Sequence, residues 1–341
     1  MIQVDRVEAF EEREWDEFLC CRPGGLFVHS MAYRDLLVEE LGCEPEYLVA
    51  HEAGEIRGLL PLMWAEDPAG RVCNSLPYNG SHGGPLAADA RADRALIEAW
   101  NERAADPSTL AATMIENPFA PPAAPGPVHE LTDERFGHFT VLPPEGRAPE
   151  LMALISPEAR NNVRRAARRG VEVELDNGAL PEVHRIHEEV MASFGARAKS
   201  RRFFDSIPER LGTDGFAVWV ARVDGEIAAA LLVVRFNGVS EYFASGTREG
   251  FRRHHPHPAL VFAALVEETR RGVRLWNWGG TRDGMDGVYH FKSKWGSRAV
   301  RYRYLVRLND RSLLDAAPDE LLGRFPGFYV VPFAALRASV A

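Results

Sequence analysis

Residues 216–236 read FAVWVARVDGEIAAALLVVRF, and the fold of the chain is best approached from this stretch. Two runs rich in valine, leucine, alanine and aromatic residues flank Asp224 and Gly225. Apolar runs of this length on either side of an Asp-Gly pair are typical of two antiparallel strands joined by a tight turn. The stretch therefore predicts a β-hairpin.

A near copy of this hairpin occurs earlier in the chain. Residues 46–63 read EYLVAHEAGEIRGLLPLM, in which GEIRGLLPL corresponds to GEIAAALLV of the later stretch. Both copies continue in the same way, because residues 75–104 and residues 240–272 each predict a strand, a glycine-containing turn and a helix. The chain thus looks like two copies of one α/β unit.

Proline-rich segments lie between the two copies. Residues 120–127 read APPAAPGP and residues 142–149 read LPPEGRAP, which is typical of turns or short linkers. A length of 341 residues is enough for two domains. We therefore expect an N-terminal domain of residues 1–150 and a C-terminal domain of residues 151–341.

The composition narrows the class of protein. With 46% hydrophobic and 26% charged residues, and no apolar run near the roughly 18 residues of a membrane span, the chain reads as globular. Its acidic N-terminus lacks the basic start and apolar middle of a signal peptide, which predicts a cytoplasmic location. No GxSxG, Walker A or strand-GxGxxG-helix motif occurs, which argues against hydrolases, nucleoside triphosphatases and Rossmann enzymes.

Arginines gather in the second half of this chain, although its net charge is −9. A helix predicted at 156–170 carries them at every fourth position, and two further basic segments lie at 197–202 and 252–257. A single run of this kind is more often a solvated surface, but three runs together favour one large polyanionic ligand. The residues expected to contact it are Arg160, Arg164, Arg168, Arg202, Arg252 and Arg253.

A cleft is expected where the strands of the second copy end. A strand at 240–247 contains Tyr242, and a strand at 274–281 contains Trp278 followed by a Gly-Gly pair, which permits close approach of a ligand. The helix that follows the first of these strands offers backbone amides to an anion. The histidines of 254–257 lie among prolines without a supporting carboxylate or cysteine, so no metal ion is expected.

Several segments together carry a family resemblance. They are RNNVRRAARRGVEVE at 160–174, the hairpin with GEIAAALLV, YFASGTREGFRR at 242–253, and WNWGGT at 276–281 followed by GVYHFKSKWG at 287–296. In these segments the chain resembles the FemABX family of peptidoglycan bridge-forming aminoacyl transferases, a branch of the GNAT-like acyltransferases. The resemblance implies an α/β fold of two tandem GNAT-like domains, each a mixed, mostly antiparallel sheet flanked by helices, with the donor site in the second.

The resemblance also implies roles for particular residues. The Phe-Lys pair of the family's C-terminal motif lies near the acyl donor, and here that pair is Phe291 and Lys292. Lys292 would steady the tRNA end or the oxyanion of the tetrahedral intermediate. Tyr242 and Asp283 are candidates for proton handling, and Trp278 for contact with the substrate.

The function expected from the resemblance is amide formation, in which a substrate amine attacks an activated ester. The donor would be aminoacyl-tRNA and the acceptor an amine of a cell-wall precursor peptide or a related small metabolite, with no bound cofactor. One alternative is an N-acyltransferase of the GNAT superfamily that uses acyl-CoA. Another is a non-catalytic protein that binds a nucleotide-linked precursor, and the oligomeric state stays open.

Overall fold

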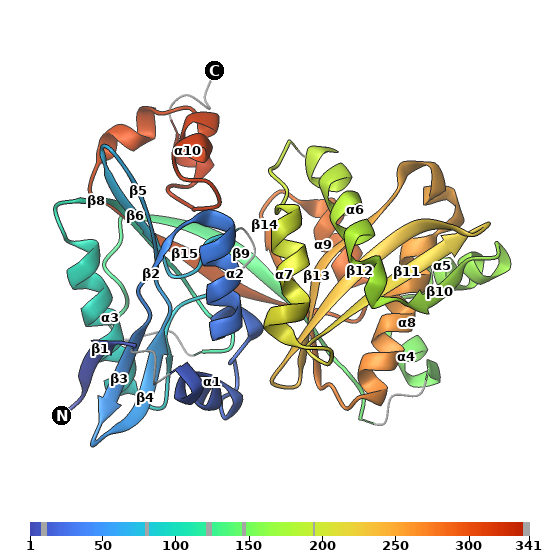
Figure 1. Ribbon diagram of the computed structural model, residues 1–341, viewed down its shortest axis with the longest axis horizontal. Coiled ribbons are helices and arrows are strands. Elements are labelled where there is room, and N and C mark those ends of the chain that lie inside the picture. The colour runs from blue at the N-terminus through green and yellow to red at the C-terminus, as the bar shows by residue number, and fades with distance from the viewer. Residues whose placement is uncertain (8–11, 79–81, 121–124, 145–147, 194, 337–341) are drawn as a thin grey trace. The chain divides into compact units, whose positions relative to one another are not determined.

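The computed structural model describes residues 1–7, 12–78, 82–120, 125–144, 148–193 and 195–336, and it divides into two compact units (Figure 1). Unit 1 comprises Met1–Phe136 and Arg301–Ala341, and unit 2 comprises Gly137–Val300. The chain leaves unit 1 along β9 (Leu131–Val141) and returns along β15 (Arg298–Leu308). The expected division near residue 150 therefore differs from the observed one, because the chain changes units within strands and not at the proline-rich segments.

Unit 2 is built on a mixed sheet. Antiparallel pairing gives the order β10-β11-β12-β13, and β14 joins β13 in parallel. The strands are β10 (Glu172–Leu175), β11 (Phe216–Val223), β12 (Glu226–Phe236), β13 (Val239–Thr247) and β14 (Leu275–Arg282). The predicted hairpin is confirmed as β11 and β12, and its turn places Asp224 at φ 51° and Gly225 at φ 83°.

Helices cover both faces of this sheet. One face carries α4 (Ala148–Leu154), α5 (Pro157–Arg168) and α8 (Pro256–Arg270), and the other carries α6 (Leu180–Ser193) and α7 (Arg201–Leu211). Neighbouring residues of β13 face opposite ways, since the Tyr242 ring lies near His257 of α8 whereas the Phe243 ring stacks on Phe203 of α7. Coverage on both faces explains why β11 and β12 read as continuous apolar runs.

The arginine-rich helix forms as the sequence predicts. Ser156 caps α5, and its side chain accepts a hydrogen bond from the backbone N–H of Ala159 at 3.1 Å. Pro157 occupies the first turn, where no intrahelical N–H is needed. The helix ends before Gly170, which has a φ of 68° that favours glycine.

Unit 1 contains two groups of paired strands. The first has the order β1-β3-β4-β7, and the second has the order β15-β8-β6-β5-β2. The strands are β1 (Gln3–Arg6), β2 (Glu44–Pro45), β3 (Leu48–Glu52), β4 (Glu55–Leu60), β5 (Met63–Asp67), β6 (Gly70–Asn74), β7 (Leu86–Ala87) and β8 (Thr109–Ile115). The predicted first-copy hairpin is confirmed as β3 and β4.

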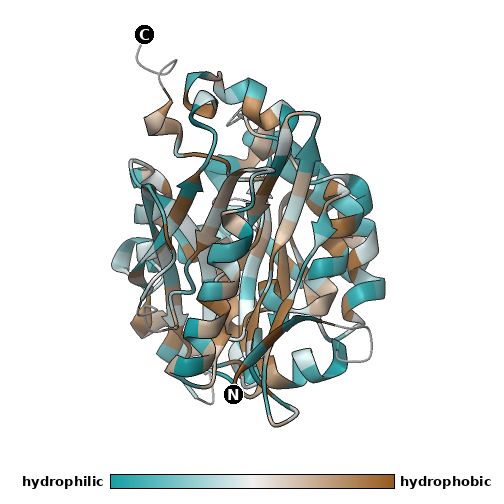
Figure 2. Cartoon of the chain, turned by 90° about the vertical axis from the view of Figure 1, so that its left-hand side faces the viewer, coloured by the Kyte–Doolittle hydropathy of each residue, from teal (hydrophilic) through white to brown (hydrophobic). Residues whose placement is uncertain are grey.

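The helices of unit 1 are α1 (Glu12–Cys20), α2 (Met31–Leu41), α3 (Ala90–Ala104) and α10 (Pro318–Arg324). Short 3-10 helices occur in unit 1 at Phe27–His29, Arg311–Asp315 and Phe333–Ala335, and in unit 2 at Asn177–Ala179 and Glu249–His254. In Figure 2 the helices alternate between brown and teal, as expected for amphipathic helices, and the strands show brown and white stretches interrupted by teal. Each described helix lacks the length or the apolar character to cross a membrane.

The internal repeat is visible in the topology. In unit 1, β6 and β8 are parallel and α3 lies between them in the chain, and in unit 2 the parallel strands β13 and β14 flank α8 in the same way. The strand expected to begin at Ser75 is absent, since β6 ends at Asn74. Pro77 has no N–H for a strand ladder and Tyr78 has a φ of 71°, which an extended strand does not allow. Residues 79–81 of the expected glycine-containing turn, and 121–124 and 145–147 of the proline-rich segments, lie outside the described residues.

A buried ion pair fastens α8 to the sheet of unit 2. Glu268 of α8 is fully buried, and both of its carboxylate oxygens accept hydrogen bonds from Arg235 of β12, from Nε at 2.8 and 3.0 Å. Ser240 of β13 donates to the same carboxylate at 2.6 Å. The bidentate geometry and the added hydroxyl satisfy a charge that would otherwise be costly to bury.

Glu268→Ala is expected to lower the free energy of unfolding by about 3–5 kcal/mol, because Arg235 then loses its buried counter-charge. Urea denaturation followed by tryptophan fluorescence measures the change. Glu267→Ala is the matched control, since Glu267 forms only a partly exposed pair with Arg271, and its loss should cost less than about 1 kcal/mol. Equal losses in the two variants would contradict this role for the buried pair.

Candidate functional site

Lys292 lies on α9 (Asp286–Ser293), and its side chain is buried, with only 5% of the residue exposed. Its Nζ donates hydrogen bonds to the backbone carbonyls of Gly279, at 3.1 Å, and Gly280, at 2.8 Å. Burial lowers the pKa of Lys292 from its usual 10.5 to about 7. The amine therefore changes charge near neutral pH, and in its protonated form it has one N–H more than the two carbonyls use.

The two carbonyls lie where β14 leaves β13. The parallel register of these strands runs only from Val239↔Leu275 to Glu241↔Asn277, so Gly279 and Gly280 follow the last pair. Gly279 has a φ of 73°, a backbone conformation that favours glycine. The Gly-Gly sequence thus lets the end of β14 turn its carbonyls toward the lysine.

A chain of buried hydrogen bonds orients this part of β14. Asn277 Nδ2 donates to Glu241 Oε2 at 2.6 Å, and Asn277 Oδ1 accepts from the backbone N–H of Gly279 at 2.8 Å. Burial raises the pKa of Glu241 to about 8, and its Oε1 has no hydrogen-bond partner among the described residues. We call Glu241, Asn277, Gly279, Gly280 and Lys292 the lysine site. The sequence analysis missed Glu241 and Asn277 as members of it.

An aromatic cluster adjoins the lysine site. The Tyr242 hydroxyl forms a hydrogen bond with Nε2 of His257 at 2.7 Å and accepts one from the hydroxyl of Ser245. Phe291, next to Lys292, stacks on His257 with ring centroids 5.3 Å apart, and Trp278 lies 5.2 Å from Tyr242. Burial raises the pKa of Tyr242 and lowers that of His257 to about 4, so at neutral pH the phenol keeps its proton and the imidazole is uncharged.

Positive charge gathers beside the start of α8. Arg169, at the end of α5, lines an open pocket of about 310 Å³ together with Arg253 and His254. Burial lowers the pKa of His255, and the nearby positive charges of Arg169 and Arg165 lower it further. We call Arg165, Arg169, Arg253, His254 and His255 the cationic cluster. His257, on the first turn of α8, connects it to Phe291 and so to the lysine site.

The arginines of this region lack acidic partners. In the part of the chain that the structure describes, no carboxylate lies within 4.0 Å of the guanidinium groups of Arg164, Arg165, Arg168, Arg169 or Arg253. Elsewhere in the protein arginines are commonly paired, as Arg222 is with Glu174 at 2.5 Å. The uncompensated charge is therefore available to an anionic ligand.

The structure brings together some of the predicted site residues. Lys292, Phe291, Tyr242 and Trp278 meet as described, although Trp278 is only 2% exposed and donates its indole N–H to Thr140 at 2.9 Å. Arg253 belongs to the cationic cluster, and Arg164 and Arg168 lie exposed on α5.

Other predicted residues lie apart from these groups. Asp283 is exposed in the turn after β14 and accepts from the N–H of Gly284. Arg160 donates to the carbonyl of Met152, and Arg252 pairs with Glu249 at 3.8 Å. Arg202 lies in the first turn of α7, on the opposite face of the sheet from α5. The three basic segments therefore do not form one surface, since a sheet separates the second from the other two.

No metal site is evident among the described residues, where no three His, Cys, Asp or Glu side chains are grouped to bind an ion. The histidines of 254–257, which were considered as metal ligands, have other neighbours in the structure. They place His254 and His255 beside arginines and His257 beside aromatic rings.

Comparison with known proteins agrees with this architecture. Residues 157–293 match the family model of the acetyltransferase (GNAT) domain, and this range contains the cationic cluster and the lysine site. No curated protein matches the sequence.

Solved structures with the same fold cover most of the chain. The crystal structure of FemX superposes with a TM-score of 0.69 at 15% identity, covering 91% of this chain and 98% of FemX. The C-terminal domain of a putative lysylphosphatidylglycerol synthetase from Agrobacterium fabrum gives a TM-score of 0.56 at 13% identity, covering 95% of this chain and 99% of that domain.

A tandem GNAT protein from the clavulanic acid biosynthesis pathway gives a TM-score of 0.51 at 13% identity, covering 90% of this chain and 97% of that protein. Identities this low establish the fold and leave substrates open. The chain therefore has the FemX-like fold of tandem GNAT units, and residues 157–293 of its second unit match the acetyltransferase (GNAT) domain.

Proposed function

We propose that this protein is an amide-forming transferase that moves an aminoacyl group from aminoacyl-tRNA to an amine of a cell-wall precursor peptide. The observation that carries the proposal is the buried Lys292 amine, held by two backbone carbonyls where β13 and β14 separate. The unpaired arginines near the start of α8 support a donor with several phosphates. The resemblance to the FemABX family supplies the acceptor class and agrees with a cytoplasmic location.

The reaction needs a proton donor or a positive charge at the oxygen that becomes negative. The acceptor nitrogen attacks the ester carbonyl carbon, a C–N bond forms, and the carbonyl oxygen becomes an oxyanion. When the C–O bond to the tRNA ribose breaks, the ribose oxygen leaves with a proton and the nitrogen loses one. A lysine ammonium with one unused N–H, fixed in a dry environment, stabilises such an oxyanion without further reorganisation.

The surrounding residues act on Lys292 through its hydrogen-bond acceptors. The carbonyls of Gly279 and Gly280 favour the protonated amine, since an ammonium donates stronger hydrogen bonds than a neutral amine. Asn277 fixes Gly279, and Glu241 fixes Asn277. Tyr242, protonated and bonded to His257, lies beside Phe291 as a positioning residue.

The cationic cluster provides the binding energy for the donor in this proposal. Guanidinium groups match phosphate oxygens, and the cluster adjoins the aromatic side chains that lead to Lys292. An acyl-CoA donor is the competing candidate, because the match to an acetyltransferase domain fits a donor of that class. The two donors differ in how many phosphates the protein can engage, which makes salt dependence the decisive measurement.

Lys292→Met is expected to lower kcat by roughly 100- to 1000-fold, since the variant keeps the volume of the side chain and removes the charge. Lys292→Arg should retain part of the activity. With the acceptor's own ionisation measured separately and divided out, the wild-type rate should fall about tenfold per pH unit above pH 7, as the ammonium loses its proton.

The arginine variant serves as the control for this pH profile, because its guanidinium stays protonated throughout and should remove the descending limb. A wild-type rate that rises through pH 7 would indicate that neutral Lys292 acts as a base. It would contradict the proposed role of Lys292 as a hydrogen-bond donor to the oxyanion.

Donor binding is expected to weaken steeply with salt. Each phosphate contact contributes roughly 0.7–0.9 to the slope of log affinity against log salt, so Arg169→Ala and Arg253→Ala should each reduce the slope by about one. Filter binding of charged bulk tRNA across a salt series measures this. Arg202→Ala, on the opposite face of the sheet, is the matched control and should leave the slope unchanged.

Consumption of acyl-CoA in parallel assays, together with a shallow salt slope for tRNA, would assign the protein to the CoA-dependent branch. A third outcome is that tRNA binding depends on the arginines while Lys292→Met leaves turnover with an amine pool unchanged. That result would favour a non-catalytic binding protein.

A further inference from the structure

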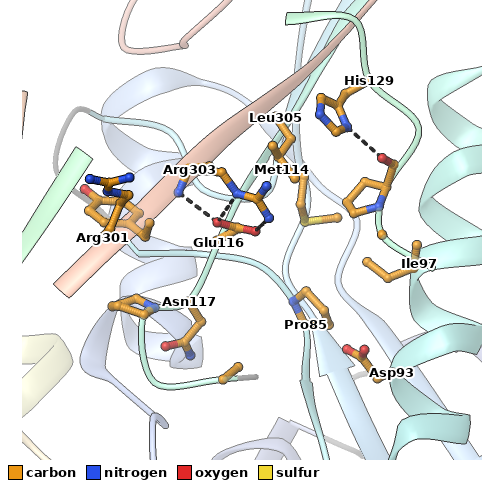
Figure 3. A pocket seen from close by; sticks show the side chains of 15 residues that line it. Pro85, Asp93, Ile97, Met114, Glu116, Asn117, His129, Arg301, Arg303 and Leu305 are labelled. Atoms are coloured by element: carbon orange, nitrogen blue, oxygen red, sulfur yellow. Dashed lines mark hydrogen bonds and ion pairs between the residues drawn. The ribbon is translucent and has the colours of Figure 1, made fainter. Parts of the chain in front are cut away.

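Unit 1 has a cavity beside the strand-helix-strand segment that corresponds in topology to β13, α8 and β14 of unit 2. There α3 follows β6 and precedes the parallel strand β8, as α8 lies between β13 and β14. A cavity of about 430 Å³ opens beside the first two turns of α3 and the end of β8 (Figure 3). This volume accommodates a small molecule.

The walls of this cavity combine apolar side chains with polar and charged ones. Ile97, Met114 and Leu305 are each 1% exposed and contribute apolar surface. Glu116 accepts from the guanidinium of Arg303 at 3.0 Å and from the backbone N–H of Arg303 at 2.9 Å, so its charge is already balanced. Figure 3 shows this pair on one side of the cavity and α3 on the other.

Asp93 is the exception in this lining. It projects from the first turn of α3, and in the described part of the chain its carboxylate has neither a hydrogen bond nor an ion pair. Burial raises the pKa of Asp93, whereas the nearby Asp89 is satisfied by Arg57 at 2.9 Å and by backbone N–H groups. A half-buried carboxylate without a cation, at the edge of a partly apolar cavity, lacks the partner that would offset its desolvation.

We propose that this cavity binds a small molecule that carries a primary ammonium group on an apolar stem of several carbons. The ammonium pairs with Asp93, and the stem lies against Ile97, Met114 and Leu305. The Glu116–Arg303 pair contributes no net charge. Arg301, which also lines the cavity, pairs with Glu134 at 3.6 Å, so Asp93 is the lining charge that is left to select for a cation. This binding site does not depend on the transfer reaction proposed above.

The two repeats would then differ in the charge that they accept. Unit 2 presents arginines, histidines and Lys292 around α8, and unit 1 presents an unpaired carboxylate at α3. The same strand-helix-strand framework thus takes an anion in one copy and a cation in the other.

The test uses the full-length protein and three probes of equal length, n-pentylamine, 1-pentanol and pentanoate, with isothermal titration calorimetry or saturation-transfer NMR. We expect saturable binding of pentylamine that is at least tenfold tighter than that of pentanol, and no binding of pentanoate. Asp93→Asn, which keeps the shape of the side chain, should weaken pentylamine at least tenfold and bring it level with pentanol. Glu98→Gln, which removes an exposed carboxylate from the same helix, is the matched control and should change nothing.

Thermal unfolding of each variant separates ligand recognition from folding. A melting temperature of Asp93→Asn equal to or above that of the wild type, together with the loss of pentylamine selectivity, supports the proposal. A lower melting temperature with unchanged affinity would assign Asp93 to stabilising the N-terminus of α3 and overturn the proposal. Equal affinities for pentylamine and pentanol in the wild-type protein, or no saturable binding of pentylamine, would overturn it as well.

Discussion

The buried amine of Lys292 imposes the strictest constraint on unit 2. An ammonium removed from water needs acceptors at fixed positions, and here they are main-chain carbonyls. Those carbonyls can face the lysine only because β14 has already parted from β13, and the backbone of Gly279 has a conformation that few other residues adopt. Asn277 and Glu241 then fix this part of β14 through buried hydrogen bonds. The burial of the Lys292 amine therefore depends on the separation of β13 and β14.

The start of α8 lies between two different environments of unit 2. The 3-10 helix Glu249–His254 joins β13 to α8, and residues three positions apart on either side of the start of α8 reach two different environments. His254 faces the pocket lined by Arg169, while His257 contacts Tyr242 and Phe291. A ligand with phosphates at one end and a reactive ester at the other fits this arrangement, since a short segment of chain separates the two environments. The buried pair of Arg235 and Glu268 fastens the distant half of the same helix.

Much of the fold follows from local sequence patterns. The two hairpins have apolar runs with turn residues between them, and α5 has a cap, a proline and a terminal glycine, so short-range chemistry was enough to predict each. The division into units was not predictable in this way, because the chain crosses between them within β9 and β15, and a strand interior carries no compositional mark.

The lysine site was only half predictable for a related reason. Lys292 and Phe291 came from the family resemblance, but Glu241 and Asn277 are 36 positions apart and meet only through strand register. Among the arginines, Arg168 was chosen by its spacing, whereas Arg169, one residue and about 100° further around the helix, lines the pocket.

The two ionisable groups of the lysine site oppose each other as pH changes. Lys292 titrates near pH 7 in the folded protein and near 10.5 when unfolded, so between these values the unfolded chain holds the extra proton and stability rises with pH. Glu241 titrates near pH 8 when folded and near 4.5 when unfolded, so between those values the folded chain holds the extra proton and stability falls as pH rises. The combined contribution is smallest between pH 7 and 8, where the two trends cancel. Burial brings the pKa values of both groups close to neutral pH, and the stability of unit 2 is therefore lowest between pH 7 and 8 as far as these two groups contribute. In the same interval a proton is most easily gained or lost at this site.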